Sequence, residues 1–355
     1  MEHTVGQKFT VNREAPLLQY LFELFPDQSR TGVRNLLGKG QVVVNGTGVT
    51  AFDHPLRPGD SLLILPKGIS IARATKAEAA DKIEAAGIRM VYEDEYLLVV
   101  DKPSGLPTIH SGGPKSGLSI QYIKDLKTKG GKASKLAQDN GLTLYSLLYE
   151  YVRQQAKAQR KEDLISGRKP DRGVKKVWIV HRLDRGTSGL IVFAKDERTK
   201  ELLQSKWRDA VIERKYTAVL EGILEEPEGT VESWLWEHPK SLKMVSSPVE
   251  KKDSQHAVTH YRVLRTVQVE KYPFTIAEFE LETGRKNQIR VHAADLGHPV
   301  AGDAKYGAET DPIRRLALHA ATLVFRNPMS GEIVRLKSPL PAAFDKFERI
   351  DKTEK

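Results

Sequence analysis

Residues 177–195, VWIVHRLDRGTSGLIVFAK, contain two short apolar runs separated by a polar loop. Runs of this kind, rich in β-branched residues and bounded by turn residues, predict two strands joined by the loop. The loop places one carboxylate, Asp184, between Arg182 and Arg185. We expect this carboxylate to be ionised, because nearby positive charge favours its charged form. An ionised aspartate on such a loop could act as a nucleophile or a base, or could form only a surface salt bridge.

The amino-acid composition limits the kind of protein that this chain can form. Its 355 residues suffice for one large domain and a small one. With 39% apolar and 29% charged residues, the chain is expected to be globular rather than disordered. The net charge of +10 predicts a polyanionic partner, with nucleic acid as the first candidate and an anionic membrane surface as the second. The absence of cysteine excludes disulfides, thiolate metal sites and cysteine nucleophiles.

No segment of the sequence predicts secretion or membrane insertion. The first residues lack a basic start followed by an apolar core, and no run approaches the roughly 20 apolar residues of a membrane-spanning helix. We therefore expect a cytoplasmic protein that does not contact membranes. The sequence contains no Walker A loop, no G-x-G-x-x-G and no H-E-x-x-H, so neither a nucleotide cofactor nor a metal is expected.

The first seventy residues predict a small separate module. The apolar residues of 16–25 fall on one helical face, and Ser29 is placed to cap a second helix. Residues 41–45 and 56–65 predict strands. The outward face of the second helix carries Arg30 and Arg34, and Lys39 follows it. These cations could bind nucleic acid or could simply keep an exposed helix face soluble.

The rest of the chain predicts a larger domain built mainly on strands. We place the small module at 1–70, a linker at 71–88 and the large domain at 89–350. Two strands are expected around the acidic turn at 93–95, followed by Lys102. A basic insertion is expected at about 107–176, where Thr143 could cap a long helix. Further strands are predicted at 213–222, 256–264, 274–282 and 316–325, with helices near 196–209 and 288–296.

The Asp184 loop, H-R-L-D-R-G-T-S-G followed by an apolar strand, resembles the signature loop of the RluA-type pseudouridine synthases. In that family the aspartate is the essential catalytic residue, which corresponds to Asp184. The sequence K-Y-T-A-V-L-E-G at 215–222 resembles the family motif whose tyrosine contacts the extruded base, here Tyr216. A tyrosine on a strand could also be an ordinary core residue.

A third stretch, T-G-R-K-N-Q-I-R-V-H followed by G-H-P-V-A-G-D-A-K-Y-G, resembles another family motif. The resemblance implies that Arg290 pairs with the catalytic carboxylate. Asn287 departs from the pattern, because the family usually has histidine there; asparagine can form hydrogen bonds but cannot carry charge. By the same resemblance, the expected substrate contacts are Arg182, Arg185, Thr187, Arg285, Asn287, Gln288 and Lys102.

The N-terminal module resembles the S4 RNA-binding domain. The matching features are SR..V..LL in the second helix, the strand G-x-V-x-V-N-G and the later turn R-P-G-D. This resemblance implies that Arg30, Arg34 and Lys39 bind RNA. Together with the synthase motifs it implies an α+β fold, with a mixed, mostly antiparallel central sheet and flanking helices, preceded by a small α/β S4 domain.

The implied reaction breaks the bond between uracil and ribose, turns the base and rejoins it through carbon. It requires an ionised carboxylate, a cation that holds it and an aromatic platform for the extruded base. Whether Asp184 attacks the sugar, attacks the base or first acts as a base is left open by the sequence. We expect a monomer acting on ribosomal RNA, with transfer RNA as the alternative.

Two other functions would leave different features in the sequence. A non-catalytic RNA-binding or ribosome-assembly factor on the same fold would be signalled by loss of Asp184, Tyr216 or Arg290, and all three are present. A glycosidase would need a second catalytic carboxylate, which no motif in this sequence supplies. The sequence therefore favours an RNA pseudouridine synthase.

Overall fold

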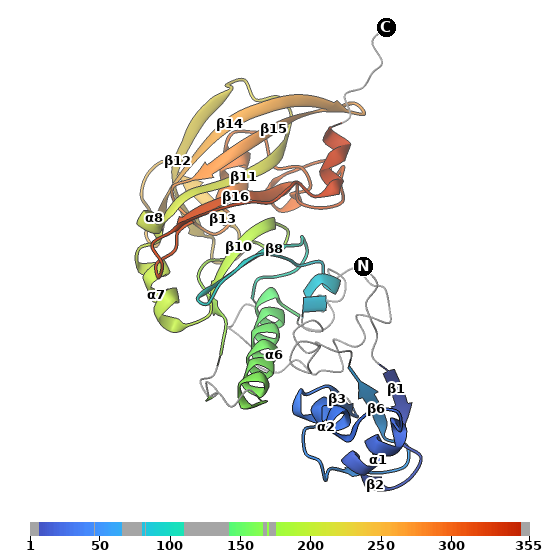
Figure 1. The fold of residues 1–355 in the computed structure, drawn as a ribbon. Coiled ribbons are helices and arrows are strands. Elements are labelled where there is room, and N and C mark those ends of the chain that lie inside the picture. Colours follow the sequence, from blue (N-terminus) through green and yellow to red (C-terminus); the bar gives the residue numbers. More distant parts are fainter. Residues whose placement is uncertain are drawn as a thin grey trace. The chain divides into compact units, whose positions relative to one another are not determined.

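The computed structural model describes residues 7–45, 47–65, 80–81, 83–109, 142–165, 169 and 175–348 (Figure 1). The chain divides into two compact units, Met1–Lys82 with Tyr149–Lys176 and Ile83–Leu148 with Val177–Lys355. Most of the linker predicted at 71–88, and much of the insertion predicted at about 107–176, lie outside the described residues.

In the N-terminal unit, residues 7–65 as described form helices α1 and α2 and a small antiparallel sheet of order β1-β6-β3-β4, with β2 and β5 paired separately. Ser29 Oγ accepts a hydrogen bond from the amide of Gly32 at 3.0 Å, which confirms the predicted cap. Apolar side chains of both helices and of the sheet form one core. The elements are β1 Gln7–Thr10, β2 Ala15–Pro16, α1 Leu17–Leu24, α2 Arg30–Gly38, β3 Val42–Val44, β4 Thr47–Gly48, β5 Pro55–Leu56 and β6 Ser61–Ile64.

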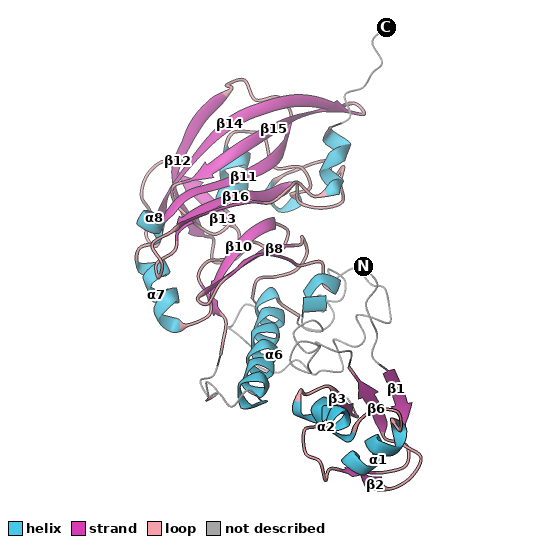
Figure 2. Ribbon diagram, in the orientation of Figure 1, coloured by secondary structure: helices cyan, strands magenta, loops and turns pink. Residues whose placement is uncertain are grey.

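The second unit is built on one large sheet (Figure 2). Its described strands follow the order β13-β12-β14-β15-β11-β16-β10-β8-β7, with β17 on β16 and β9 on β10. The pairing of β10 with β16 is parallel and the other described pairings are antiparallel, which confirms the predicted mostly antiparallel sheet. The strands are β7 Arg89–Glu93, β8 Leu97–Lys102, β9 Trp178–Ile179, β10 Ser188–Ala194, β11 Val211–Glu221, β12 Glu228–Glu237, β13 Met244–Ser247, β14 Gln255–Val269, β15 Tyr272–Leu281, β16 Leu318–Arg326 and β17 Ile333–Lys337.

The end of the Asp184 loop is fixed by a close approach of two strands. Gly189 has φ +111°, and a Cβ atom there would lie 2.3 Å from the carbonyl oxygen of Ala320 on β16. Only glycine fits this backbone conformation and this space. All seven residues of β10 are buried, as expected for a continuous apolar strand inside a sheet. The loop before β10 is therefore anchored to an interior strand of the sheet, between β16 and β8.

Two helices of the chain begin at residues whose side chains cap them. The amide of Ser146 donates to Thr143 Oγ1 at 3.1 Å at the start of α6, as predicted. The amide of Thr199 donates to Asp196 Oδ1 at 2.8 Å at the start of α7. No helix within the described ranges is long and apolar enough to span a membrane. The helices are α6 Leu144–Ile165, α7 Glu197–Ser205, α8 Trp207–Ala210, α9 Gln288–Asp295 and the 3-10 turns η1 Ala304–Tyr306 and η2 Ala342–Phe347.

Candidate active site

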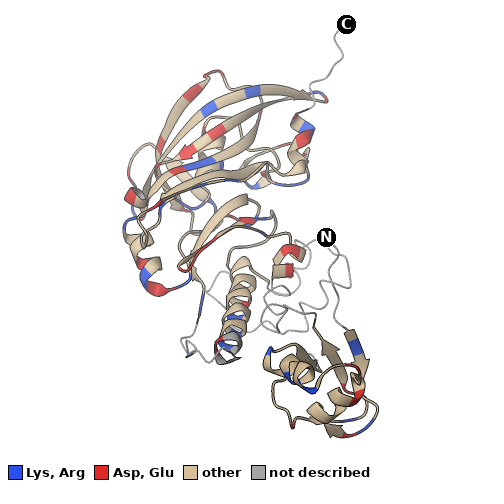
Figure 3. Ribbon diagram, in the orientation of Figure 1, with Lys and Arg blue, Asp and Glu red and all other residues tan. Residues whose placement is uncertain are grey.

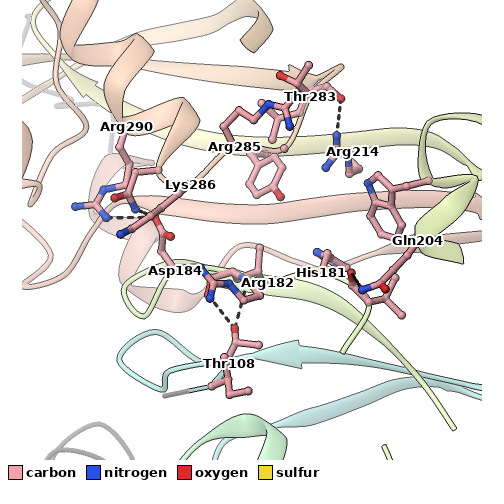
Figure 4. A pocket seen from close by; sticks show the side chains of 18 of the residues that line it. Thr108, His181, Arg182, Asp184, Gln204, Arg214, Thr283, Arg285, Lys286 and Arg290 are labelled. Carbon is pink, nitrogen blue, oxygen red and sulfur yellow. Dashed lines mark hydrogen bonds and ion pairs between the residues drawn. The ribbon is translucent and has the colours of Figure 1, made fainter. Parts of the chain in front are cut away.

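A cavity of about 1510 Å³ brings the three predicted catalytic residues together. Asp184 enters it from the loop before β10 and Arg290 from α9 (Figure 4). Tyr216 lines it from β11. Eight Lys or Arg side chains and four carboxylates line the cavity, so it favours an anionic ligand. The predicted contacts that also line it are Arg182, Arg185, Arg285 and Asn287.

One oxygen of the Asp184 carboxylate receives both side-chain contacts. Asn287 Nδ2 donates to Oδ2 at 2.5 Å, and Arg290 Nη1 donates to the same oxygen at 3.2 Å. Among the described residues, no side chain or amide donates to Oδ1. The Asp184 side chain is 26% exposed, and the Thr187 amide holds the loop backbone by donating to the Asp184 carbonyl at 3.1 Å. This geometry fixes the carboxylate and leaves one oxygen available to a ligand.

The second carboxylate that holds Arg290 was not assigned from the sequence. Arg290 Nε and Nη2 donate to the two oxygens of Asp303 at 2.6 Å and 2.7 Å. The guanidinium also lies 4.9 Å from the ring centre of Tyr306. Burial would lower the pKa of Arg290, but the hydrogen bonds to Asp303 and the charges of Asp303 and Asp184 raise it above its ordinary value. The arginine is therefore a permanent cation with a fixed orientation.

Asn287 has a left-handed backbone, with φ +57° and ψ +20°, immediately before α9. Asparagine and histidine adopt this conformation more readily than most residues, which is a physical reason for finding either at this position. Tyr306 donates its hydroxyl to Asn287 Oδ1 at 3.1 Å and accepts the Met244 amide at 3.2 Å. Burial raises the pKa of Tyr306 to about 12, so its hydroxyl keeps the proton. This chain of bonds directs the amide nitrogen of Asn287 towards Asp184.

Tyr216 lies on β11 between β15 and β16, opposite Phe279 and Ala320. Its side chain is 9% exposed and lines the cavity. Burial raises the pKa of Tyr216; the charge of Arg214 lowers it in part, and the smaller effect of the Asp184 charge raises it. The tyrosine is therefore neutral at physiological pH and offers an aromatic surface beside the carboxylate.

Lys102 was expected to contact the substrate, but it does not line the cavity. Its side chain is fully buried, and the ammonium donates to the carbonyls of Leu106, Pro103 and Arg185 at 2.9, 3.0 and 3.3 Å. Burial, followed by the charge of Arg315, lowers the pKa of Lys102 to about 7. The lysine joins the turn after β8 to the Asp184 loop, a position that sequence spacing alone does not reveal.

Gln288 and Thr187 are also buried and lie outside the cavity lining. Gln288 Oε1 accepts from Thr283 Oγ1 at 2.8 Å and from the Arg285 amide at 2.9 Å. Its Nε2 donates to the Val258 carbonyl at 2.9 Å. These bonds occupy the amide group, so Gln288 fastens the segment before α9 instead of facing a ligand.

The three arginines predicted to contact the substrate differ in exposure and in their hydrogen bonds. Arg182 and Arg185 are exposed, and Arg185 Nε donates to the Gly105 carbonyl at 3.0 Å. Arg285 Nε donates to the His256 carbonyl at 2.9 Å.

Within the described ranges, no three His, Asp or Glu side chains are grouped as a metal site requires.

Sequence reasoning missed several residues of this site. Asp303 and Tyr306 lie in the stretch G-D-A-K-Y-G, whose motif was noted without a role for its polar side chains. His181, Trp207 and Arg214 also line the cavity. Burial lowers the pKa of His181 to about 3, and its Nε2 accepts the Val192 amide at 3.2 Å. A neutral histidine here supports the loop and is not a proton donor.

Comparison with known proteins leads to the same family as the sequence motifs. The sequence model of the RNA pseudouridylate synthase family matches residues 96–295. An uncharacterized RNA pseudouridine synthase of Bacillus subtilis is 34% identical, over 93% of this chain and 91% of that protein. Ribosomal large subunit pseudouridine synthase D of Pasteurella multocida is 31% identical, over 92% and 88%. The solved structure of human RNA pseudouridylate synthase domain containing 4 is 22% identical, covers 78% of this chain and 97% of that chain, and has a TM-score of 0.49. The chain belongs to the RNA pseudouridylate synthase family and is an RNA pseudouridine synthase.

Proposed function

We propose that this enzyme isomerises specific uridines of large-subunit ribosomal RNA, with Asp184 as the catalytic carboxylate. The observation that carries the proposal is the arrangement in which Asn287 and Arg290 both hold Oδ2 of Asp184 and leave Oδ1 open. Support for a ribosomal substrate comes from the Pasteurella relative, whose name specifies the large ribosomal subunit.

The proposed reaction requires that the target uridine leave its stack and enter the cavity. The bond from N1 of uracil to ribose C1′ breaks, the base turns, and C5 bonds to C1′ while the C5 proton is lost and N1 is protonated. Asp184 Oδ1 acts at the ribose–uracil linkage, and Tyr216 packs against the extruded base. Arg290, held by Asp303, keeps the carboxylate charged and aimed.

Three of the expected contact residues are better assigned to positioning. Lys102 links two loops through main-chain carbonyls, Gln288 fastens the approach to α9, and Thr187 holds the Asp184 backbone. Since all three are buried, we propose that they keep the catalytic loop in place without touching RNA. The exposed Arg182 and Arg185, and the half-buried Arg285, remain the proposed RNA contacts of the cavity.

We also propose that the N-terminal unit binds RNA through α2, in keeping with its resemblance to an S4 domain. Arg30, Arg34 and Lys39 are exposed on or just after this helix. Figure 3 marks Lys and Arg positions along α2 in blue. Arg30 and Arg34 both lie over the ring of Phe22, at 5.7 Å and 5.9 Å from its centre. The ring restricts both guanidinium groups while leaving them exposed to phosphates.

The test is to map pseudouridines in total RNA from cells with and without the gene. The cells lacking it are then complemented with wild type, Asp184→Asn or Asp209→Asn. We expect specific pseudouridines of large-subunit ribosomal RNA to return with wild type and Asp209→Asn but not with Asp184→Asn. Asp209 is the matched control, because its carboxylate lines the same cavity. If Asp184→Asn restores the missing pseudouridines, Asp184 is not the catalytic carboxylate. If the missing pseudouridines all lie in transfer RNA, transfer RNA is the substrate instead of ribosomal RNA.

A further inference from the structure

Arg214 is a buried cation in the wall of the cavity that the reaction scheme does not use. It lies on β11, two residues before Tyr216, and is 8% exposed. Its Nη2 donates to the Leu281 carbonyl at 3.2 Å. Among the residues that the structure describes, no carboxylate forms an ion pair with Arg214, whereas Arg290 has two. A buried guanidinium without an anion is costly unless a bound ligand supplies the charge.

Gly284 provides the space that Arg214 occupies. A Cβ atom on Gly284 would lie 2.8 Å from Arg214 Nη1. The φ angle of Gly284 is not in the left-handed region, so its backbone does not require glycine. The missing side chain therefore serves to admit the guanidinium and to leave it facing the cavity.

The surroundings of Arg214 suit a nucleotide. The guanidinium lies 5.7 Å from the ring centre of Trp207, which is half-buried and also lines the cavity. The ring of His181 also lies beside this indole, with the ring centres 4.9 Å apart. Figure 4 shows Arg214 and His181 towards the opposite end of the cavity from Arg290. A cation beside an aromatic ring is the usual means of binding a phosphate and a base of single-stranded RNA.

The size of the cavity leaves room for such a second site. Its volume of about 1510 Å³ exceeds the roughly 300–1000 Å³ of pockets that enclose one small ligand. Tyr216 and Arg214 point to the same face of β11 and are separated by about 6.6 Å along the strand. An RNA chain whose extruded uracil packs on Tyr216 would thus carry a neighbouring backbone group towards Arg214.

We propose that Arg214 binds the phosphate of a nucleotide next to the extruded uridine, with Trp207 packing against that nucleotide. This inference rests on the proposed function, because it places the second nucleotide relative to the uridine at Asp184. The phosphate supplies the negative charge that the protein does not provide at this position. The subsite would fix which side of the extruded uridine the RNA chain enters from.

The test measures binding of full-length protein to the RNA segment around the mapped uridine, as a function of salt. We expect Arg214→Met to weaken binding and to reduce the slope of log affinity against log salt by about one. Arg214→Lys should keep the slope. Lys215→Met is the matched control, because Lys215 carries the same charge on the same strand but pairs with Glu213 and Glu280 outside the cavity. A slope in Arg214→Met equal to that of wild type would overturn the proposal.

The wild-type part of a second measurement does not depend on the folding of the Arg214 variant. Each phosphate within two nucleotides of the target uridine is replaced in turn by an uncharged methylphosphonate, and binding to wild-type protein is measured. One substitution should weaken binding to wild type and to Lys215→Met, and its effect should be lost in Arg214→Met. Gly284→Ala should reduce the same effect by displacing Nη1. Equal binding of every substituted RNA to wild type would exclude the subsite.

These outcomes are separate from those that test Asp184. If Asp184→Asn loses isomerisation but Arg214→Met keeps the wild-type salt slope, the proposed function is supported and the Arg214 subsite is excluded. Retained isomerisation in Asp184→Asn removes the catalytic assignment, and the phosphate scan still reports whether Arg214 binds RNA.

Discussion

Asp303 binds both Nε and Nη2 of Arg290, at 2.6 Å and 2.7 Å, and its own side chain is only 1% exposed. Arg290 therefore presents its remaining nitrogen, Nη1, to Asp184 from a fixed position. The two carboxylates share one guanidinium, so the Asp184 carboxylate is held without being fully neutralised. A buried pair of this kind orients a charged group more than it stabilises the fold.

We expect Asp303→Asn to lower the single-turnover rate by about ten- to hundredfold. The variant loses one charge-assisted hydrogen bond, worth about 1.5–3 kcal/mol. The free energy of unfolding should fall by a similar amount, while the Kd for RNA stays within a few-fold. Rates at saturating RNA and urea unfolding curves check this. A wild-type rate would show that Arg290 does not depend on Asp303 for its position.

Arg290→Met should suppress the chemical step far more than RNA binding. The variant leaves Asp184 and Asp303 without their common cation, and we expect a rate loss of about a hundredfold or more. Lys206→Met is the control, because Lys206 is exposed and lines the cavity without contacting Asp184. Single-turnover rates at saturating RNA decide the matter. A normal rate with weakened binding would instead make Arg290 an ordinary RNA contact.

Two substitutions of Asn287 separate its backbone role from its side-chain role. Asn287→Gly tolerates φ +57° but loses the hydrogen bond to Asp184, whereas Asn287→Ala loses the bond and strains the backbone. Both should reduce the rate by about ten- to hundredfold. Only Asn287→Ala should carry the additional left-handed cost of about 1 kcal/mol. Equal stability of the two variants would contradict the backbone argument.

The exposed arginines of α2 should control part of the salt dependence of RNA binding. We expect Arg30→Gln with Arg34→Gln to reduce the slope of log affinity against log salt by about two, because two phosphate contacts are lost. Arg13→Gln is the control, since Arg13 is exposed but already paired with Glu23. A double variant whose slope equals that of the control would show that α2 does not hold phosphates.

His292 should make the protein sensitive to acid. Burial lowers the pKa of His292 to about 4, from about 6.5 in the unfolded chain. Between these values the unfolded state binds more protons, so stability is full above pH 6.5 and falls as the pH drops to 4. The contribution is at most about 3 kcal/mol.

Urea unfolding between pH 4 and 7.5 measures this effect. We expect His292→Gln to flatten the loss, because glutamine can still bond Ser233 and Thr259 but does not titrate. His238→Gln, at an exposed position, should leave the pH dependence unchanged. An unaltered pH dependence in His292→Gln would mean that His292 is not the group being protonated.

The sequence by itself predicted most strands of the large sheet, though not β12, β13 or β17, together with two helix caps and the motifs that meet at Asp184. These are local properties: apolar periodicity, turn residues and short side-chain bonds act within a few residues of each other. The cap at Ser29, the buried strand after Gly189 and the helix ending near Gly297 follow from such signals. The family resemblance added the pairing of Arg290 with Asp184, which the structure shows at 3.2 Å.

Only the tertiary structure decided which side chains face the cavity and which lie behind it. Asn287 and Asp184 are 103 residues apart, and their contact depends on β10, β16 and β11 being neighbours in the sheet. Lys102 and Gln288 belong to recognisable motifs but point into the protein. Arg214 alternates with Lys215 on one strand, and the sheet alone decides which of the two cations is buried. Burial and partner choice arise from segments far apart in the chain, whose packing no local pattern encodes.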